Sequence, residues 1–177
     1  FRYSAFCRRY RDWTGRQRLS MRQVYTAGEK TFVDYAGLQP QLVDPTSGEV
    51  FLVELFVAVL GASNFTYAEA TLTQQSADFI ASHSRALEFF GGVSAIIVPD
   101  QLRTGVGRPC RYEPGLQRTY AEWAQHYDTV IIPARPRKPR DKAKVEAAVL
   151  VAERWSLARL RHEVFHTLGA LNARIRE

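Results

Sequence analysis

The stretch TFVDYAG, residues Thr31 to Gly37, places one carboxylate, Asp34, among apolar residues whose pattern predicts a β-strand over residues 30–36. A charge inside such a strand costs free energy unless a partner or an ion compensates it. Asp34 could also face solvent across the pleat. It is nevertheless the first candidate for a functional side chain.

The elements predicted around this strand alternate between strands and helices. Two more strands are expected over residues 50–60 and 64–72, after a turn at 44–48. Helical spacing of apolar residues predicts a helix over 73–90 that ends at Gly91, and the apolar run from Ser94 to Val98 predicts a strand buried on both faces. The elements expected after it are a helix at 115–126, a strand at 129–132 and a helix at 141–160. This order predicts an α/β fold, with a mixed five-stranded sheet and helices on both faces.

Length and composition set limits on the class of protein. A chain of 177 residues with 46% hydrophobic residues is long enough for one domain with a sizeable core. The longest apolar run, Leu55 to Leu60, is far too short to span a bilayer, so we expect no membrane association. Cys7 and Cys110 form no CxxC pair, and no signal peptide is visible, so a reducing cytoplasm is expected. Because the chain opens on Phe1, we expect it to be a fragment of a longer protein.

Charge is unevenly distributed along the chain. Residues 1–30 carry a net charge of +6, residues 31–102 one of −7, and residues 103–161 one of +7. Twenty of the 24 basic residues are Arg, which suits bidentate contacts to phosphate, although genomic base composition produces the same bias. A basic run is also often only a solvated face. Charge alone therefore leaves nucleic-acid binding open.

The first 27 residues are predicted to be partly helical and basic. Four aromatic residues there are spaced by three or four positions and share one helix face: Tyr3, Phe6, Tyr10 and Trp13. Such a stripe is more typical of a packing surface than of a binding platform.

Three carboxylates stand out by their positions. Asp34 lies inside the first strand, Asp100 directly follows the buried strand that ends at Val98, and Glu146 lies in a helix at the edge of a basic run. Open α/β sheets place their sites at the carboxyl ends of strands, where Asp100 falls. Each residue also has an ordinary interpretation, because Asp100 could cap a turn and Glu146 could pair with Lys142. Together, however, the first strand and its neighbour can bring Asp34 and Asp100 close, with the later helix alongside.

Three longer stretches match a known family. They are Ser20 to Gly37, Val98 to Val106 and Pro139 to Glu146, and the tail from Phe165 to Glu177 also matches. At these residues the chain resembles the catalytic core of DDE transposases and retroviral integrases, and most closely the IstA-type transposases of bacterial insertion sequences. Gln101 stands where relatives commonly have Asn. The resemblance implies a ribonuclease-H-like fold.

The resemblance also implies roles for the three carboxylates. Asp34, Asp100 and Glu146 match the DDE triad, with 65 residues between the first two and 45 between the last two. Such a triad holds two Mg²⁺ ions, for which Mn²⁺ is a substitute, with Asp34 bridging both, Asp100 on one and Glu146 on the other. The activity implied is cleavage of transposon DNA ends, followed by transfer of the freed 3′-hydroxyl into target DNA.

The basic run before Glu146 explains why a lone carboxylate lies there. A metal ligand for DNA chemistry must lie where phosphates are attracted. The residues expected to attract and position DNA are Arg135, Arg137, Lys138, Arg140, Lys142 and Lys144.

A competing motif is His162-Glu-Val-Phe-His166, which matches the HExxH pattern of zinc proteases. We expect no zinc site, because no third ligand follows and Thr167 is a plausible N-cap that would place both histidines before a helix.

The expected organisation is a basic, partly helical extension over residues 1–27, the DDE core over 28–160 and a C-terminal linker or helix start over 161–177. The partners implied are transposon and target DNA, further copies of the chain as a homodimer or higher multimer, and the ATP-driven AAA+ helper protein IstB. End-specific recognition is expected outside this segment, because no helix-turn-helix is recognisable in residues 1–30. An alternative function is a non-catalytic DNA-binding or assembly module of the same fold, inactive in isolation.

Overall fold

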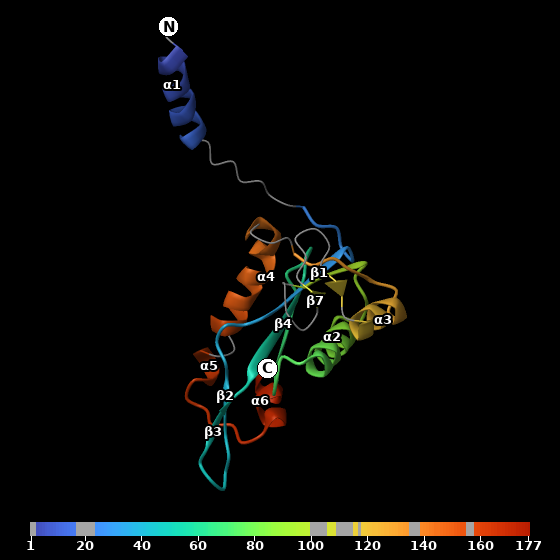
Figure 1. The fold of residues 1–177 in the computed structure, drawn as a ribbon. Coiled ribbons are helices and arrows are strands. Elements are labelled where there is room, and N and C mark those ends of the chain that lie inside the picture. Colours follow the sequence, from blue (N-terminus) through green and yellow to red (C-terminus); the bar gives the residue numbers. More distant parts are fainter. Residues whose placement is uncertain are drawn as a thin grey trace.

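The computed structural model describes residues 3–16, 24–99, 106–108, 115–116, 118–134, 139–154 and 158–177 (Figure 1). Its helices and strands are α1 (Tyr3–Arg16), β1 (Lys30–Tyr35), β2 (Gln41–Val43), β3 (Val50–Leu52), β4 (Glu54–Leu60), β5 (Thr66–Thr71), α2 (Ser76–Phe90), β6 (Ile96–Pro99), β7 (Val106–Arg108), β8 (Gly115–Leu116), α3 (Arg118–His126), β9 (Val130–Ile131), α4 (Pro139–Ala152), α5 (Ala158–Leu160) and α6 (Leu168–Ile175).

The predicted mixed five-stranded sheet is confirmed, with the strand order β5-β4-β1-β6-β9. The first strand, β1, lies in the middle. It pairs antiparallel with β4, where Asp34 faces Val57, and parallel with β6, where Val33 faces Pro99. The strand that carries Asp34 is therefore hydrogen-bonded on both sides.

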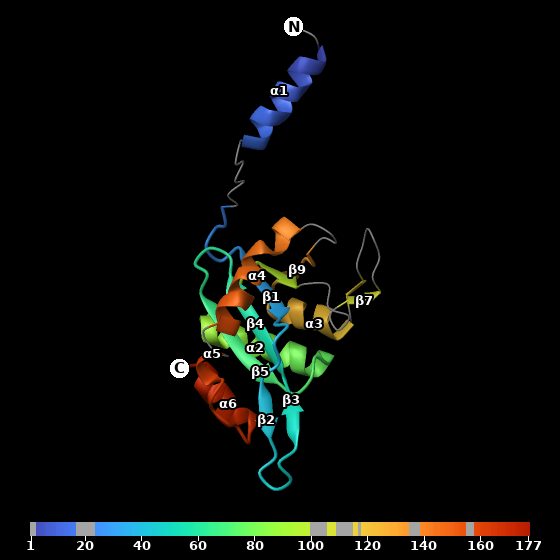
Figure 2. The ribbon, with the colours of Figure 1, turned by 90° about the vertical axis from the view of Figure 1, so that its left-hand side faces the viewer.

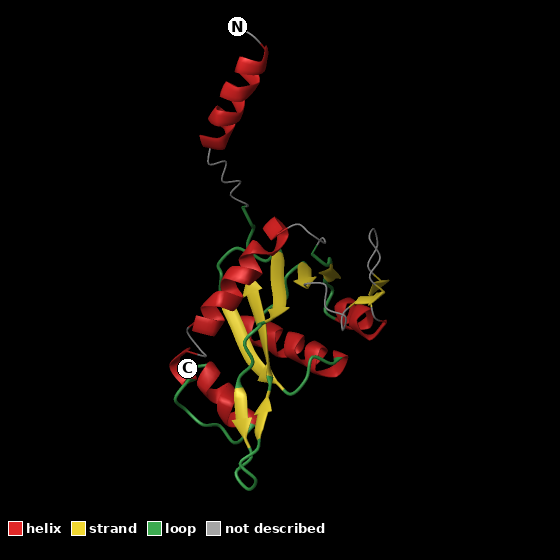
Figure 3. Ribbon diagram, turned by 60° about the vertical axis from the view of Figure 1, so that its left-hand side comes forward, coloured by secondary structure: helices red, strands yellow, loops and turns green. Residues whose placement is uncertain are grey.

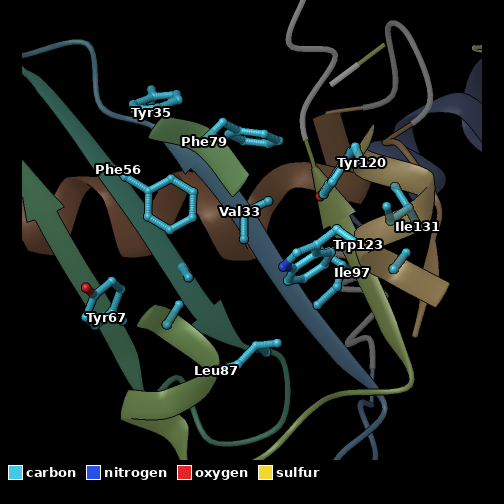
Figure 4. Close-up of a cluster of buried hydrophobic side chains, with 13 residues drawn as sticks. Val33, Tyr35, Phe56, Tyr67, Phe79, Leu87, Ile97, Tyr120, Trp123 and Ile131 are labelled. Carbon is cyan, nitrogen blue, oxygen red and sulfur yellow. The ribbon is translucent and has the colours of Figure 1, made fainter. Parts of the chain in front are cut away.

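Helices cover both faces of the sheet, as predicted (Figure 2). On one face α2 and α3 pack over an aromatic core in which Phe56, Phe79 and Tyr120 are almost fully buried (Figure 4). On the other face α4 packs against β1 and β4 through Ala148 and Ala152. The small alanine side chains let the helix backbone approach the sheet closely.

The helix α2 starts three residues later than predicted and ends where predicted. Asp78 in its first turn accepts hydrogen bonds from both the backbone N–H and the hydroxyl of Thr73, at 3.0 and 2.5 Å. These bonds hold Thr73 outside the helix. At the other end Gly91 adopts the left-handed conformation, with φ of 70°, which glycine reaches without steric cost.

The predicted strand over residues 50–60 is in fact two strands, because Val53 interrupts it. The Val53 N–H donates to the carbonyl of Pro40, and the buried Val53 side chain packs beside Leu42. Residues before the break instead form β3, which pairs with β2 in a separate hairpin beyond the sheet (Figure 3). The predicted turn is confirmed, because the Asp44 carboxylate accepts from the N–H groups of Thr46 and Ser47.

The C-terminal segment packs on the outer strand β5. Within the single helix predicted over 141–160, the structure describes α4 and the short α5, and residues 155–157 between them lie outside the described residues. The last helix, α6, lies along β5 with Leu171 buried. The side chain of Asn172 hydrogen-bonds to both backbone groups of Ala70. The domain limits proposed from the sequence stay predictions.

The N-terminal helix α1 is present as predicted, and Figures 1 and 2 show it beyond the end of the sheet. Across the described residues, no helix is both long and apolar enough to cross a membrane.

Candidate active site

Asp34 lies on the central strand and on the side of the sheet that α4 covers. Side chains alternate between the two faces of a strand. Val33 and Tyr35 point into the aromatic core under α2, whereas Phe32 and Ala36 point toward α4. Asp34 shares the face of the latter pair. Its side chain is partly buried, and its Oδ1 accepts a hydrogen bond of 2.8 Å from the Tyr35 N–H.

The neighbouring strand β6 ends beside Asp34. Its last residue, Pro99, pairs with Val33, the residue directly before Asp34. Because the two strands are parallel, their carboxyl ends meet at one edge of the sheet. Asp100 follows Pro99 in the sequence and lies outside the described residues.

Glu146 lies on α4 and is exposed to solvent. Seven residues later in the sequence, directly after the end of α4 at Ala152, lies Glu153. The Glu153 carboxylate accepts a hydrogen bond of 3.3 Å from the N–H of Leu38, four residues after Asp34. The end of α4 is therefore held beside the chain that leaves β1. Glu153 was not predicted from the sequence.

The predicted DNA-binding residues are only partly described. Arg135, Arg137 and Lys138 lie outside the described residues. The backbone of α4 includes Arg140, Lys142 and Lys144, whose side chains are likewise outside the description. Among the residues that are described, no group of three or more His, Cys, Asp or Glu side chains forms a metal-binding cluster.

The HExxH motif does not lie on one helix. His162 lies in a turn after α5, and His166 precedes α6 and bonds to the carbonyl of Val43 at 2.8 Å. The predicted N-cap is confirmed, since the Thr167 hydroxyl accepts from the Ala170 N–H at 3.1 Å. The two histidines therefore lack the shared helix face that a zinc protease requires.

Two buried polar groups lie on the opposite face of the sheet. Glu69, only 2% exposed, accepts two hydrogen bonds from Arg85 and one from the Tyr67 hydroxyl. Burial lowers the pKa of His83 to about 4, so its ring is neutral near pH 7. Its Nδ1 donates to the Phe79 carbonyl, which leaves Nε2 to accept from the Tyr120 hydroxyl. These contacts stabilise the core and do not face Asp34.

Solved structures with the same fold include the catalytic core domain of a retroviral integrase. One is the HTLV-2 integrase catalytic core domain in complex with magnesium, with a TM-score of 0.59 and 12% identity, covering 86% of this chain and 85% of that one. Another is a simian T-cell lymphotropic virus intasome in complex with the PP2A regulatory subunit B56 gamma, with a TM-score of 0.62 and 14% identity. The match covers 87% of this chain and 49% of that one. The fold is therefore the ribonuclease-H-like fold of integrase cores, as predicted.

Sequence relatives narrow the class further. The chain is 51% identical over 177 residues to the "Putative transposase for insertion sequence IS408" of Burkholderia multivorans. It is 50% identical over 175 residues to the "Putative transposase for insertion sequence IS1162" of Pseudomonas fluorescens. It covers 34% and 31% of those proteins, so it spans about a third of their length. No family model matches the chain. The chain is thus homologous to one segment of insertion-sequence transposases, which confirms the resemblance noted from the sequence.

Proposed function

We propose that this chain is the catalytic core of a transposase that cuts transposon DNA ends and joins the freed 3′-hydroxyl to target DNA, with Asp34, Asp100 and Glu146 as its catalytic carboxylates. One observation carries the proposal. Asp34 lies on the central strand, on the α4 side of the sheet, beside the carboxyl end of the parallel strand β6. The finer assignment to the IstA type is part of the same proposal.

The contact between Glu153 and Leu38 supports a short distance between Asp34 and Glu146. From that contact, Glu146 lies about 10 Å back along the helix at about 1.5 Å per residue. Asp34 lies at most about 13 Å back along an extended chain. Because α4 and β1 run in the same general direction (Figure 2), these two estimates support similar positions of the two carboxylates along the sheet. Side chains of this length can then converge on one ion.

The donor set fits magnesium. Hard carboxylate oxygens are the ligands that Mg²⁺ takes in proteins, and usually only one or two of them belong to the protein. Asp34 and Glu146 both keep solvent access, which leaves room for water and substrate oxygens. A related fold, the HTLV-2 core, was solved with magnesium. When bound, a pair of such ions would stabilise the charge that develops on the attacking and leaving phosphodiester oxygens.

The side chains have different roles in this proposal. The carboxylates would hold the divalent ions, while the basic residues from Arg135 to Lys144 would bind the phosphates on either side of the reacting one. In each reaction step one P–O bond forms and one breaks. First water attacks the phosphate at the transposon end and displaces the 3′-oxygen, and then the freed 3′-hydroxyl attacks a phosphate of target DNA and displaces the 3′-oxygen of that phosphodiester. No bond to the protein is required.

The partners and location form part of the proposal. We infer that the whole protein acts in the bacterial cytoplasm on transposon and target DNA, assembles as a homodimer or higher multimer, and works with the AAA+ helper IstB. The alternative, a DNA-binding or assembly module with an inactive triad, predicts the same charge and fold.

An anomalous difference map from crystals soaked in Mn²⁺ tests the site directly. We expect a peak within about 2.4 Å of carboxylate oxygens of Asp34 and at least one other triad member. A peak bound by other residues, or carboxylates of Asp34 and Asp100 on opposite faces of the sheet, would refute the proposed site.

Variants of the triad then distinguish a catalytic core from a DNA-binding or assembly module that has no catalytic activity. Asp34→Asn and Glu146→Gln should abolish Mn²⁺-dependent nicking of plasmid DNA while electrophoretic mobility shifts show unchanged DNA binding. The matched control is Glu122→Gln, which removes an exposed carboxylate from α3 on the opposite face and should leave nicking intact. Loss of DNA binding in step with nicking would favour the module.

A further inference from the structure

The hairpin formed by β2 and β3 projects beyond the five-stranded sheet (Figure 3), and its two edges differ. The β2 edge is closed by the segment before α6, because the Val43 N–H donates to the Phe165 carbonyl at 2.8 Å and the Val43 carbonyl bonds to His166 at 2.8 Å. β3 forms the other edge, and among the described residues it pairs with β2 alone. Its three side chains are apolar and exposed: Val50 (52%), Phe51 (45%) and Leu52 (56%).

The register of the hairpin shows which backbone groups of β3 point away from β2. In an antiparallel pair, every second residue bonds to the partner strand, and the residues between direct their N–H and C=O groups to the other side. The Asp44 N–H donates to the Glu49 carbonyl and the Val53 N–H to the Pro40 carbonyl, so positions 49, 51 and 53 face β2. The N–H and C=O groups of Val50 and Leu52 therefore point outward. We name these four groups, together with the three exposed side chains, the β3 edge.

The described residues of the main sheet do not extend alongside the β3 edge. On that side β5 pairs with β4 only as far as Thr71, which lies opposite Glu54. The chain then turns into α2, with the Thr73 N–H bonded to Asp78. Proteins usually protect an open strand edge with proline, lysine or a bulge, and β3 has none of these. Backbone donors and acceptors in this arrangement bind another extended strand.

Charge restricts the strand that the β3 edge accepts. Residues 38–54 carry three carboxylates, Asp44, Glu49 and Glu54, and no Lys or Arg. Such a surface repels the phosphates of DNA. A second copy of β3 is also disfavoured, because each hairpin would contribute its three carboxylates and no Lys or Arg. A strand with basic residues at its ends is attracted instead.

We propose that the β3 edge docks an extended segment of a partner protein, which adds a third strand to the hairpin. The two partner residues opposite Val50 and Leu52 exchange backbone hydrogen bonds with them. Directly opposed side chains lie on the same face of a sheet, so these two partner residues should be apolar. Lys or Arg should flank them, because the hairpin is acidic.

The length of β3 predicts a reversible contact. The strand has three residues, so pairing along the β3 edge alone should give a dissociation constant of roughly 0.1–1 mM. Further contacts of a whole partner protein would add to this affinity. The proposal does not depend on the catalytic carboxylates.

A nuclear magnetic resonance titration of the 177-residue chain with the peptide KTVYVTK, blocked at both ends, tests the docking. Its two valines are placed to face Val50 and Leu52, and the peptide reads the same in both directions, so it suits either strand orientation. We expect the backbone amide signals of Val50 and Leu52 to move most and to saturate as the peptide is added. No shift of these two signals up to about 5 mM peptide would overturn the proposal.

The backbone pairing is tested on both molecules. Leu52→Pro removes an outward N–H that makes no bond to β2 and should weaken peptide binding about tenfold or more. Leu52→Val keeps the N–H and an apolar side chain and should bind the peptide as the wild type does. A peptide with both valines N-methylated loses its donors without any change in the protein and should also bind about tenfold more weakly. Equal binding of the methylated and unmethylated peptides would overturn the strand pairing, even if Leu52→Pro unfolds the hairpin.

The acidic peptide ETVYVTE tests the charge of the partner. At low salt it should bind about fivefold more weakly than KTVYVTK, and equal binding would overturn the assignment of a basic segment. If the Val50 and Leu52 signals shift with protein concentration alone, the β3 edge pairs with a second copy of this chain. If a DNA duplex shifts them, the edge contacts DNA. Either result would overturn the assignment of a partner protein.

Discussion

Asn172 on α6 bonds to both backbone groups of Ala70 on the outer edge of β5: its Oδ1 accepts from the N–H at 2.6 Å, and its Nδ2 donates to the carbonyl at 2.9 Å. One side chain thus takes the place of a neighbouring strand. An open strand edge is a site for unwanted pairing with other chains, and α6 covers part of it here.

Replacing Asn172 should destabilise the fold. Asn172→Ala leaves the Ala70 N–H and carbonyl without these partners, and we expect a loss of about 1–3 kcal/mol in the free energy of unfolding. Asn172→Asp keeps an acceptor for the N–H but sets an oxygen against the carbonyl, so it should cost at least as much. Urea denaturation measures both. Gln125→Ala on the exposed side of α3 is the control, and an Asn172→Ala variant as stable as this control would contradict the prediction.

The ion pair between Arg85 and Glu69 should contribute far more than a surface pair. Arg85→Ala leaves the Glu69 carboxylate buried without its cation, and because the Arg85 side chain is itself 42% exposed we expect a loss of about 2–3 kcal/mol. The matched control is Arg118→Ala, which removes a 92% exposed partner of Glu122 and should cost less than about 0.5 kcal/mol. Equal losses in urea denaturation would show that the burial of Glu69 is unimportant.

The free energy of unfolding should fall as the pH is lowered from 6.5 toward 4. In this range His83 stays neutral in the folded protein but is protonated in the unfolded chain. The pKa of His83 is about 4 in the folded protein against an ordinary 6.5, so between these values the unfolded chain binds the extra proton. Stability is therefore retained above pH 6.5 and lost toward pH 4, with roughly 2 kcal/mol lost between pH 7 and pH 5.

His83→Gln provides the control for this pH dependence, because the amide does not titrate. Its free energy of unfolding should change much less over the same range. The carboxylates of Glu29, Asp44 and Glu163 have lowered pKa values because they accept hydrogen bonds, and their contributions are lost mainly below pH 4.5. If the free energy of unfolding of His83→Gln depends on pH as steeply as that of the wild type between pH 7 and pH 5, then other groups cause the effect.

Glu153 should act as a positioning residue for the proposed site. Glu153→Ala removes the bond to the Leu38 N–H and should weaken Mn²⁺ binding about three- to tenfold, measured by electron paramagnetic resonance. Glu153→Gln keeps an acceptor oxygen and should restore most of the affinity. Glu88→Ala, on the other face of the sheet, removes the same charge and should have no effect. If the Gln variant binds Mn²⁺ as weakly as the Ala variant, charge rather than the hydrogen bond matters.

The sequence predicted the sheet well because its strands are strongly apolar and its turns carry distinct residues. Asp34 could be placed on a central strand, since a charge between Val33 and Tyr35 is unusual in a buried strand. The break at Val53 could not be predicted, because the residues on both sides of it are equally β-prone and only the bond to Pro40 separates them.

The candidate site was predictable only in part. The two strands that meet beside Asp34 follow from local patterns, and the family resemblance supplied Asp100 and Glu146. The link between Glu153 and Leu38 joins residues 115 positions apart, and no local pattern encodes it. The same is true of the bond between Asn172 and Ala70. Contacts of this kind depend on how helices and strands pack against one another after they have formed.

The central position of β1 has a consequence for the timescales on which the site can move. Its backbone amides are bonded to β4 and β6, so they should exchange with deuterium only when the sheet as a whole opens. α4 packs on the sheet through small side chains, and most of its described side chains, over residues 146–152, are exposed, so it should open locally at a lower free energy. Asp34 would then be a stationary ligand, whereas Glu146 would arrive and leave with its helix.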